Sequence, residues 1–218
     1  MGVNVEKCLQ AWTNSLRQMH VKADVVFYGD SLTYYGDFSS QFPNQRVCNL
    51  GLRGDTIEGV INRLEQVQLL DPKVVYLMVG INDVANCTLD VFRNQYESLV
   101  AKLQEFVPNA EVFIQSMLPV NDIDFTMSCN NELIVECNKQ IADIASKYHY
   151  QFINLFSEYV VNGVLPKDST IDGLHLKISY YAKWYLLLKK MLRIELSTLL
   201  AQSNFLNALI ALVLLLIC

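Results

Sequence analysis

Short apolar runs alternate with longer amphipathic segments along most of this chain, and this alternation constrains the fold more than any other feature. The runs predicted to be buried strands are residues 25–28, 47–50, 74–79, 112–117 and 152–155. Helical patterns occupy residues 56–70, 89–106, 131–148 and 178–196. Strands that alternate with helices need right-handed crossovers and form a parallel sheet covered on both faces. The pattern therefore predicts one α/β domain over about residues 21–193, preceded by a helix at 5–19.

Composition excludes several classes of protein. The 218 residues are 52% hydrophobic and 18% charged, which is typical of a globular protein. The net charge of −5 argues against a nucleic-acid partner, because that function needs a basic stripe. The six cysteines form no C-x-x-C pair, so we expect free thiols in a reducing compartment. The sequence contains no metal-binding motif and no phosphate or dinucleotide fingerprint, and it predicts no cofactor.

The C-terminal segment differs from the rest of the chain. Residues 196–218 carry no charged side chain after Glu195, and three basic residues, Lys189, Lys190 and Arg193, stand just before them. A membrane-spanning helix needs roughly 20 apolar residues, and this tail reaches that length only by including several polar ones. Two interpretations stay open: a membrane anchor, or a helix packed on the body or on a partner subunit. We therefore predict a domain at 1–195 and an apolar tail at 196–218. Since the N-terminus lacks a secretory pattern, we expect a cytoplasmic protein, possible membrane contact being confined to the tail.

Polar residues follow the ends of several predicted strands. They stand in the segments Gly29-Asp30-Ser31, "NLGLRGDT" ending at Thr56, "VGINDV" ending at Val84, and "IDGLHL" ending at Leu176. The carboxyl ends of parallel strands meet at one edge of a sheet, where ligands bind. We therefore expect three of these segments, those that directly follow their strands, to converge.

The converging residue types suit acyl transfer. A serine hydroxyl needs a base to become a nucleophile, and His175 can be that base for Ser31. Asp172, three residues before the histidine, can orient the imidazole. An oxyanion needs two or three aimed donors, which the backbone N–H groups of Ser31 and Gly54 and the side-chain amide of Asn82 can supply.

These four segments resemble the blocks of the SGNH/GDSL hydrolase family. "YGDSLT" is similar to its nucleophile block, "GLRGDT" to its second block, "GIND" to its third and "DGLH" to its last. The resemblance covers residues 27 to the helix after the histidine, and is closest to the branch of platelet-activating-factor acetylhydrolases and lysophospholipase-like enzymes. It implies a flavodoxin-like three-layer α/β/α sandwich. It also implies a serine esterase with Ser31, Asp172 and His175 as the triad and Ser31, Gly54 and Asn82 as the oxyanion hole.

The substrate is less well determined by the sequence. Tyr34, Tyr35 and Phe38 either line an acyl or sugar pocket or pack against the sheet. The polar loop at 119–131 favours a short-chain ester on a carbohydrate or small molecule, such as an acetylated sugar. The apolar tail instead favours a lysophospholipid. The same triad would also serve an acyltransferase, and a catalytically inactive scaffold protein is the non-enzymatic possibility. The sequence does not predict the oligomeric state.

Overall fold

Five parallel strands form one sheet in the described part of this protein. The computed structural model describes residues 5–191, and the chain divides into two units, Met1–Ile178 and Ser179–Cys218. The sheet belongs to the first unit and has the strand order β2-β1-β3-β4-β5. Its strands are β1 (Val25–Gly29), β2 (Val47–Gly51), β3 (Val74–Met78), β4 (Glu111–Gln115) and β5 (Gln151–Ile153). This order is the flavodoxin-like one, so the predicted fold is confirmed.

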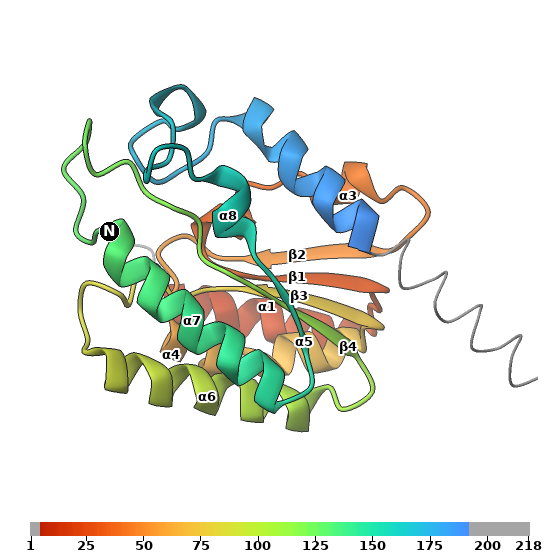
Figure 1. Ribbon diagram of the computed structural model, residues 1–218. Coiled ribbons are helices and arrows are strands. Elements are labelled where there is room, and N and C mark those ends of the chain that lie inside the picture. Colours follow the sequence, from red (N-terminus) through yellow and green to blue (C-terminus); the bar gives the residue numbers. More distant parts are fainter. Residues whose placement is uncertain (1–4, 192–218) are drawn as a thin grey trace, which may run out of the picture. The chain divides into compact units, whose positions relative to one another are not determined.

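Helices precede, connect and follow the strands of the first unit (Figure 1). They are α1 (Val5–Met19), α2 (Ser31–Tyr34), α3 (Phe38–Gln41), α4 (Ile57–Asn62), α5 (Leu64–Leu70), α6 (Leu89–Phe106), α7 (Asn131–Lys147) and α8 (Leu155–Tyr159). Two short 3-10 turns follow at Lys167–Ser169 and Ile178–Tyr180. The second of these turns ends within the second unit, whose described part continues as a helix over residues 181–191, in which Tyr181 stacks on Trp184. None of the helices within residues 5–191 is both long and apolar enough to cross a membrane.

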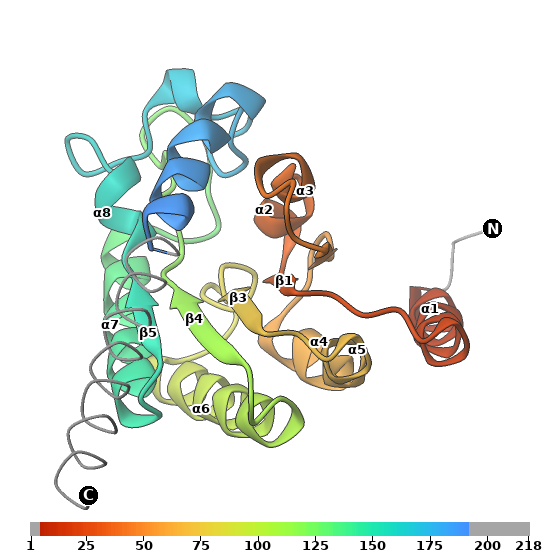
Figure 2. The same ribbon diagram turned by 90° about the vertical axis from the view of Figure 1, so that its right-hand side faces the viewer.

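Both faces of the sheet are covered. On one face, aliphatic strand residues such as Val26, Leu77 and Ile114 join a buried core with side chains of α4, α5, α6 and α7, which lie together on that side in Figures 1 and 2. On the other face, Phe27 and its neighbours Tyr76 and Phe113 stack ring on ring across three strands. Strands buried on both faces read as continuous apolar runs, which explains why the sequence pattern located them.

The main difference from the predicted elements lies at Arg63. The helix expected over residues 56–70 is two helices, because the backbone at Arg63 (φ −122°, ψ 19°) ends α4 and precedes α5. Both halves share the same apolar periodicity, so the break leaves no trace in the hydrophobic pattern. The end of the helix predicted to reach residue 196, and the whole tail at 196–218, lie outside the described residues.

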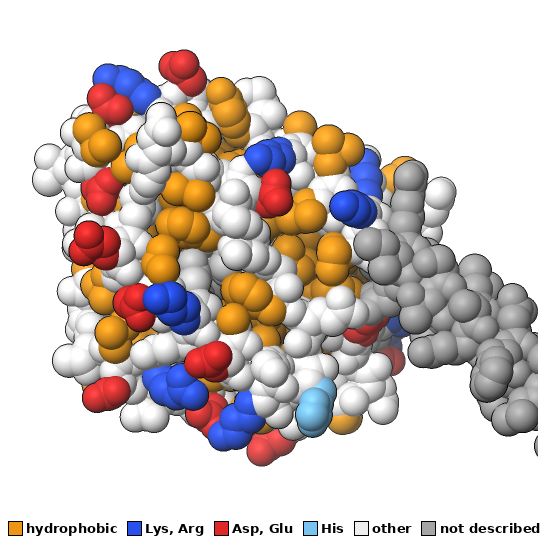
Figure 3. Space-filling view, in the orientation of Figure 1, with side chains coloured by type: hydrophobic (Ala, Val, Ile, Leu, Met, Phe, Trp, Pro, Cys, Tyr) orange, Lys and Arg blue, Asp and Glu red, His pale blue; other side chains and the backbone are white. Residues whose placement is uncertain are grey.

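Charges on the surface are mixed. Figure 3 shows acidic and basic side chains interspersed with apolar ones on the face that it presents. The five cysteines within residues 5–191 are unpaired thiols.

Candidate active site

The end of β1 places Ser31 where the strand order reverses. β1 lies between β2 and β3, whose crossovers leave in opposite directions, and ligands bind at such switch points. Asp30 is the N-cap of α2, and its carboxylate accepts the backbone N–H of Leu32 at 2.9 Å. Ser31 is therefore the first residue of a short helix that starts directly after the strand. The serine is held by a strand on one side and a capped helical turn on the other.

His175 connects Ser31 to Asp172. The Ser31 Oγ lies 2.9 Å from His175 Nε2, and His175 Nδ1 lies 2.7 Å from Asp172 Oδ2. The other carboxylate oxygen of Asp172 accepts the backbone N–H groups of His175 and Leu174, at 2.8 and 3.1 Å. The carboxylate thus fixes both the imidazole and the backbone that carries it. A continuous chain of hydrogen bonds runs from the serine hydroxyl to the aspartate.

The environment of Asp172 favours its ionised form. Burial raises the pKa of this carboxyl, but the hydrogen bonds from the His175 ring and from two backbone N–H groups outweigh it, so the pKa lies below its usual value. An ionised aspartate stabilises an imidazolium ion beside it. The pair is therefore suited to a histidine that accepts a proton.

The turn between Asp172 and His175 is supported by the loop after β4. Gly173 has a φ of +93°, and a Cβ at this position would meet Met127 Sδ and Phe125 Cβ at 2.8 Å. The Gly173 carbonyl accepts the backbone N–H of Asn121 at 2.8 Å. Both the left-handed backbone and the crowding require glycine here. The loop at 119–131 consequently buttresses the segment that presents His175.

Three donors suited to an oxyanion lie at neighbouring strand ends. Within the described residues, the backbone N–H groups of Ser31 and Gly54 have no hydrogen-bond acceptor. Gly54 is exposed, with a φ of +72° that favours glycine although a Cβ would meet no atom within 4 Å. Asn82 donates one amide hydrogen to the carbonyl of Asp55 at 2.8 Å. Its second amide hydrogen is not needed for that bond, so it can serve a ligand.

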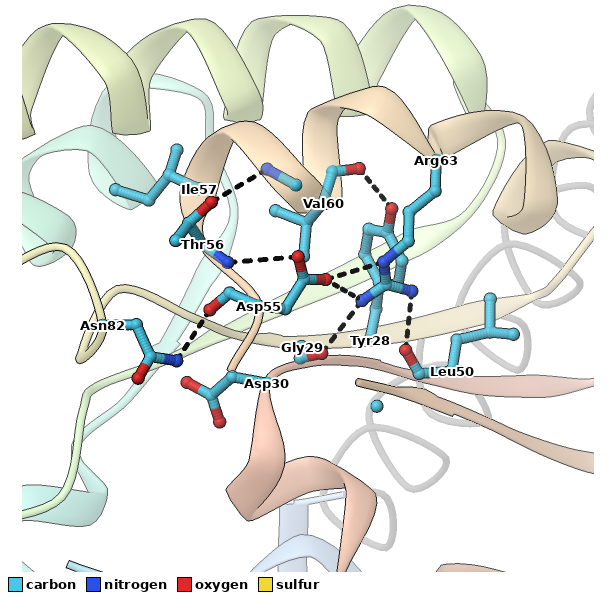
Figure 4. Close-up of polar contacts among 12 residues, drawn as sticks. Tyr28, Gly29, Asp30, Leu50, Asp55, Thr56, Ile57, Val60, Arg63 and Asn82 are labelled. Carbon is cyan, nitrogen blue, oxygen red and sulfur yellow. Dashed lines mark hydrogen bonds and ion pairs between the residues drawn. The ribbon is translucent and has the colours of Figure 1, made fainter. Parts of the chain in front are cut away.

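A buried arginine ties these strand ends together (Figure 4). The Arg63 guanidinium donates to Asp55 Oδ2 at 2.7 Å, to the Leu50 carbonyl at 2.7 Å and to the Gly29 carbonyl at 2.9 Å. It also lies 4.4 Å from the centre of the Tyr28 ring. The side chains of Arg63 and Asp55 are only 3% and 6% exposed, so their ion pair is shielded from water. Arg63 thus connects the ends of β1 and β2 to Asp55, whose backbone carbonyl accepts the hydrogen bond from the Asn82 amide.

Two further carboxyl groups near this network are hard to ionise. Burial raises the pKa of Asp30 to about 7, and the nearby carboxylates of Asp55 and Asp83 add to the effect. Burial likewise raises the pKa of Asp83 to about 6, although the N–H of Ile57 donates to this carboxylate. The donor, Ile57, is the first residue of α4, so this hydrogen bond connects the turn after β3 to that helix.

The structure brings the predicted triad residues into contact and places the predicted oxyanion donors at adjacent strand ends. It separates the three aromatic residues that follow the nucleophile: Tyr34 and Tyr35 are exposed, whereas Phe38 is buried and stacks on Phe27 at 3.8 Å. The polar side chains of the 119–131 loop serve local structure. Asn121 bonds to Asp124, and Asn131 to the backbone of Val120. They therefore give no support for a polar substrate.

The sequence pattern did not reveal the role of Arg63. The only available signal was an arginine within an amphipathic helical pattern, which is ordinarily a surface residue. No group of three or more His, Cys, Asp or Glu side chains within residues 5–191 has the arrangement of a metal site.

The fold and this hydrogen-bonded Ser-His-Asp chain are those of α/β enzymes that form acyl-enzymes on serine. A sequence model of the GDSL-like lipase/acylhydrolase family matches residues 27–183, so the chain belongs to that family. It is a carboxylic ester hydrolase, and the resemblance noted in the sequence is confirmed. No curated protein matches the chain.

Solved structures show the same fold. One is a Streptococcus pneumonia protein provisionally called a platelet activating factor, with a TM-score of 0.74, 24% identity, and coverage of 88% of this chain and 100% of that one. A GDSL-like lipase from Bacteroides thetaiotaomicron has a TM-score of 0.70 and 21% identity, and the match covers 86% of this chain and 98% of that one. An acetyl-xylooligosaccharide esterase mutant from Geobacillus Stearmophilus has a TM-score of 0.64 and 19% identity, and the match covers 78% of this chain and 94% of that one.

Proposed function

We propose that this protein hydrolyses a short-chain ester, such as an acetyl ester, on a carbohydrate or related small molecule, through an acyl-enzyme on Ser31. The observation that carries the proposal is the hydrogen-bonded chain from Ser31 through His175 to Asp172. The nucleophile, its base and the group that orients the base are each within hydrogen-bonding distance of the next.

The two steps use the same residues. His175 Nε2 accepts the hydroxyl proton as Ser31 Oγ attacks the ester carbonyl, and the N–H groups of Ser31 and Gly54 and the amide of Asn82 hold the oxyanion. His175 then gives the proton to the leaving alcohol, whose bond to the carbonyl carbon breaks. Water attacks the acyl-enzyme by the same route and releases the acid and the serine.

Two observations support a small acyl group on a carbohydrate. The exposed rings of Tyr34 and Tyr35 meet edge to face, 5.2 Å between centres. The Tyr35 ring in turn lies 5.6 Å from the imidazole of His175. An exposed aromatic surface with polar hydroxyls beside the histidine suits an alcohol that has both apolar and polar faces. The structural similarity to an acetyl-xylooligosaccharide esterase points to the same class.

The test is hydrolysis of p-nitrophenyl esters from acetyl to palmitoyl, followed by acetylated oligosaccharides. Ser31→Ala should abolish turnover, and Ser39→Ala, an exposed serine eight residues later, is the matched control. Activity confined to acetyl and butyryl esters supports the proposal. A preference for long chains would favour a lysophospholipid instead, and turnover retained in Ser31→Ala would refute the mechanism.

A further inference from the structure

Arg53 differs from the other arginines of the described chain. Arg17, Arg46, Arg63 and Arg93 each pair with a carboxylate. Arg53 is exposed and has no carboxylate partner within residues 5–191. Its guanidinium carbon instead lies 5.7 Å from the centre of the Tyr35 ring. Among residues 5–191 this cation therefore lies over an aromatic ring and has no carboxylate to neutralise its charge.

The Tyr35 ring connects Arg53 to the catalytic centre. This ring is 44% exposed and meets the His175 imidazole edge to face, with 5.6 Å between ring centres and 86° between planes. Arg53 also directly precedes Gly54, a proposed oxyanion donor. The Arg53 guanidinium therefore contacts a ring that itself contacts the His175 imidazole. In the sequence, Arg53 is next to the residue proposed to hold the oxyanion.

The position of Tyr35 indicates which part of an ester Arg53 would meet. In a serine esterase the histidine gives its proton to the leaving alcohol, so groups packed around the imidazole lie near the alcohol part of the substrate. A guanidinium stacked on a ring still presents its N–H groups along its edge, where a carboxylate or phosphate can bind.

The charges around the site give a cation such as Arg53 a role if the substrate is anionic. The chain has a net charge of −5, and the Asp172 side chain, with a lowered pKa, is 51% exposed. An anionic substrate would meet repulsion at this site unless a nearby cation offset it. A neutral substrate would not require a cation at this position.

We propose that Arg53 binds an anionic group, carboxylate or phosphate, on the alcohol part of the ester, so that the enzyme prefers acidic esters over neutral ones of the same shape. The inference rests on the proposed function, because it assigns the substrate class of the same site. It adds a specificity residue that the chemistry of hydrolysis does not need.

The experiment uses matched esters. The value of kcat/KM is measured for 4-acetoxybenzoate, its methyl ester and 4-acetoxyphenyl phosphate with the parent protein and with Arg53→Gln. For each substrate the ratio of variant to parent is taken, which cancels the intrinsic reactivity of the leaving group. Arg46→Gln is the control: it removes one positive charge just before β2, at the opposite end of the strand, where Arg46 pairs with Asp24.

We expect Arg53→Gln to lower kcat/KM for an anionic ester about ten-fold more than it lowers kcat/KM for the methyl ester. A loss of this size is typical of one partly exposed charged contact. In the parent protein, added salt should reduce the preference for an anionic ester over the methyl ester, because salt screens the attraction to Arg53. The anionic ester that loses more identifies carboxylate or phosphate as the preferred group. Arg46→Gln should change all three ratios equally.

Equal losses on all three esters in Arg53→Gln would overturn the inference, since they would indicate a general disturbance of the site. Unchanged ratios would overturn it as well. Either result, with turnover that still depends on Ser31, leaves the proposed function intact. Loss of the dependence on Ser31 would instead refute the proposed function.

Discussion

Replacing Arg63 should show how much the strand ends around Ser31 depend on one buried side chain. Arg63→Met keeps most of the aliphatic stem and removes the guanidinium. The variant loses the ion pair with Asp55 and two hydrogen bonds to the carbonyls of Gly29 and Leu50. Because both members of the pair are almost wholly buried, water cannot easily replace the lost partner.

The expected cost follows from this burial. Removing one partner of a buried ion pair typically costs about 3–5 kcal/mol, because the remaining charge is left uncompensated. Domains of this kind are stable by about 5–15 kcal/mol, so the variant should be folded but much weakened. Arg63→Lys keeps the charge but lacks the planar fork that reaches three acceptors, so its loss should be about 1–3 kcal/mol.

Urea denaturation, followed by far-UV circular dichroism and tryptophan fluorescence, measures these free energies. The double variant Arg63→Met/Asp55→Asn closes a mutant cycle. Since it removes the charge that the single variant leaves buried, its cost should fall below the sum of the single costs by about 1–3 kcal/mol. Burial raises the pKa of Asp55 and the guanidinium opposes this shift. The penalty in Arg63→Met should therefore be larger at pH 8 than at pH 5.

Two results would refute this reasoning. A cost below about 1 kcal/mol for Arg63→Met would mean that the pair contributes no more than an exposed one does. Additive single costs in the cycle would mean that Asp55 and Arg63 are not coupled, contrary to their contact.

Two further predictions concern other carboxyl groups. Because the folded pKa of Asp30 is about 7 and the ordinary pKa of an aspartate is 3.8, the folded chain holds a proton that the unfolded chain releases, so stability should fall as pH rises from about 4 to 7. Asp30→Asn keeps the helix cap and should remove this pH dependence of the unfolding free energy. In urea titrations the variant should be more stable than the parent by up to about 4 kcal/mol at pH 8, and an identical pH dependence in the two proteins would contradict this. Asp172→Asn should lower kcat by about 10²–10⁴ while the fold is kept, as circular dichroism would show, because the imidazole loses its orienting carboxylate; an unchanged kcat would assign that role to another group.

Much of this fold could be predicted from local patterns. The central strands β1, β3 and β4 were found because they are buried on both faces and read as apolar runs. The edge strands β2 and β5 are only partly buried, but their shorter apolar runs were also located. The helix at Val5–Met19 and the helix at Leu89–Phe106 begin and end where their periodicity does. The break at Arg63 was missed, because periodicity records which side a residue faces and carries no information on a change in helix direction.

The sequence by itself determined the strand and helix order, the family, and the candidate residues Ser31, Gly54, Asn82, Asp172 and His175. These follow from the order of residues along the chain, and parallel strands bring their carboxyl ends to one edge whatever the details of packing. Only the tertiary structure decided that Arg63 is buried against Asp55, that Phe38 packs on the sheet and that Arg53 lies over the ring of the tyrosine beside the histidine. Those contacts join residues from different elements, and their strength depends on burial and distance, which arise only when the chain has folded.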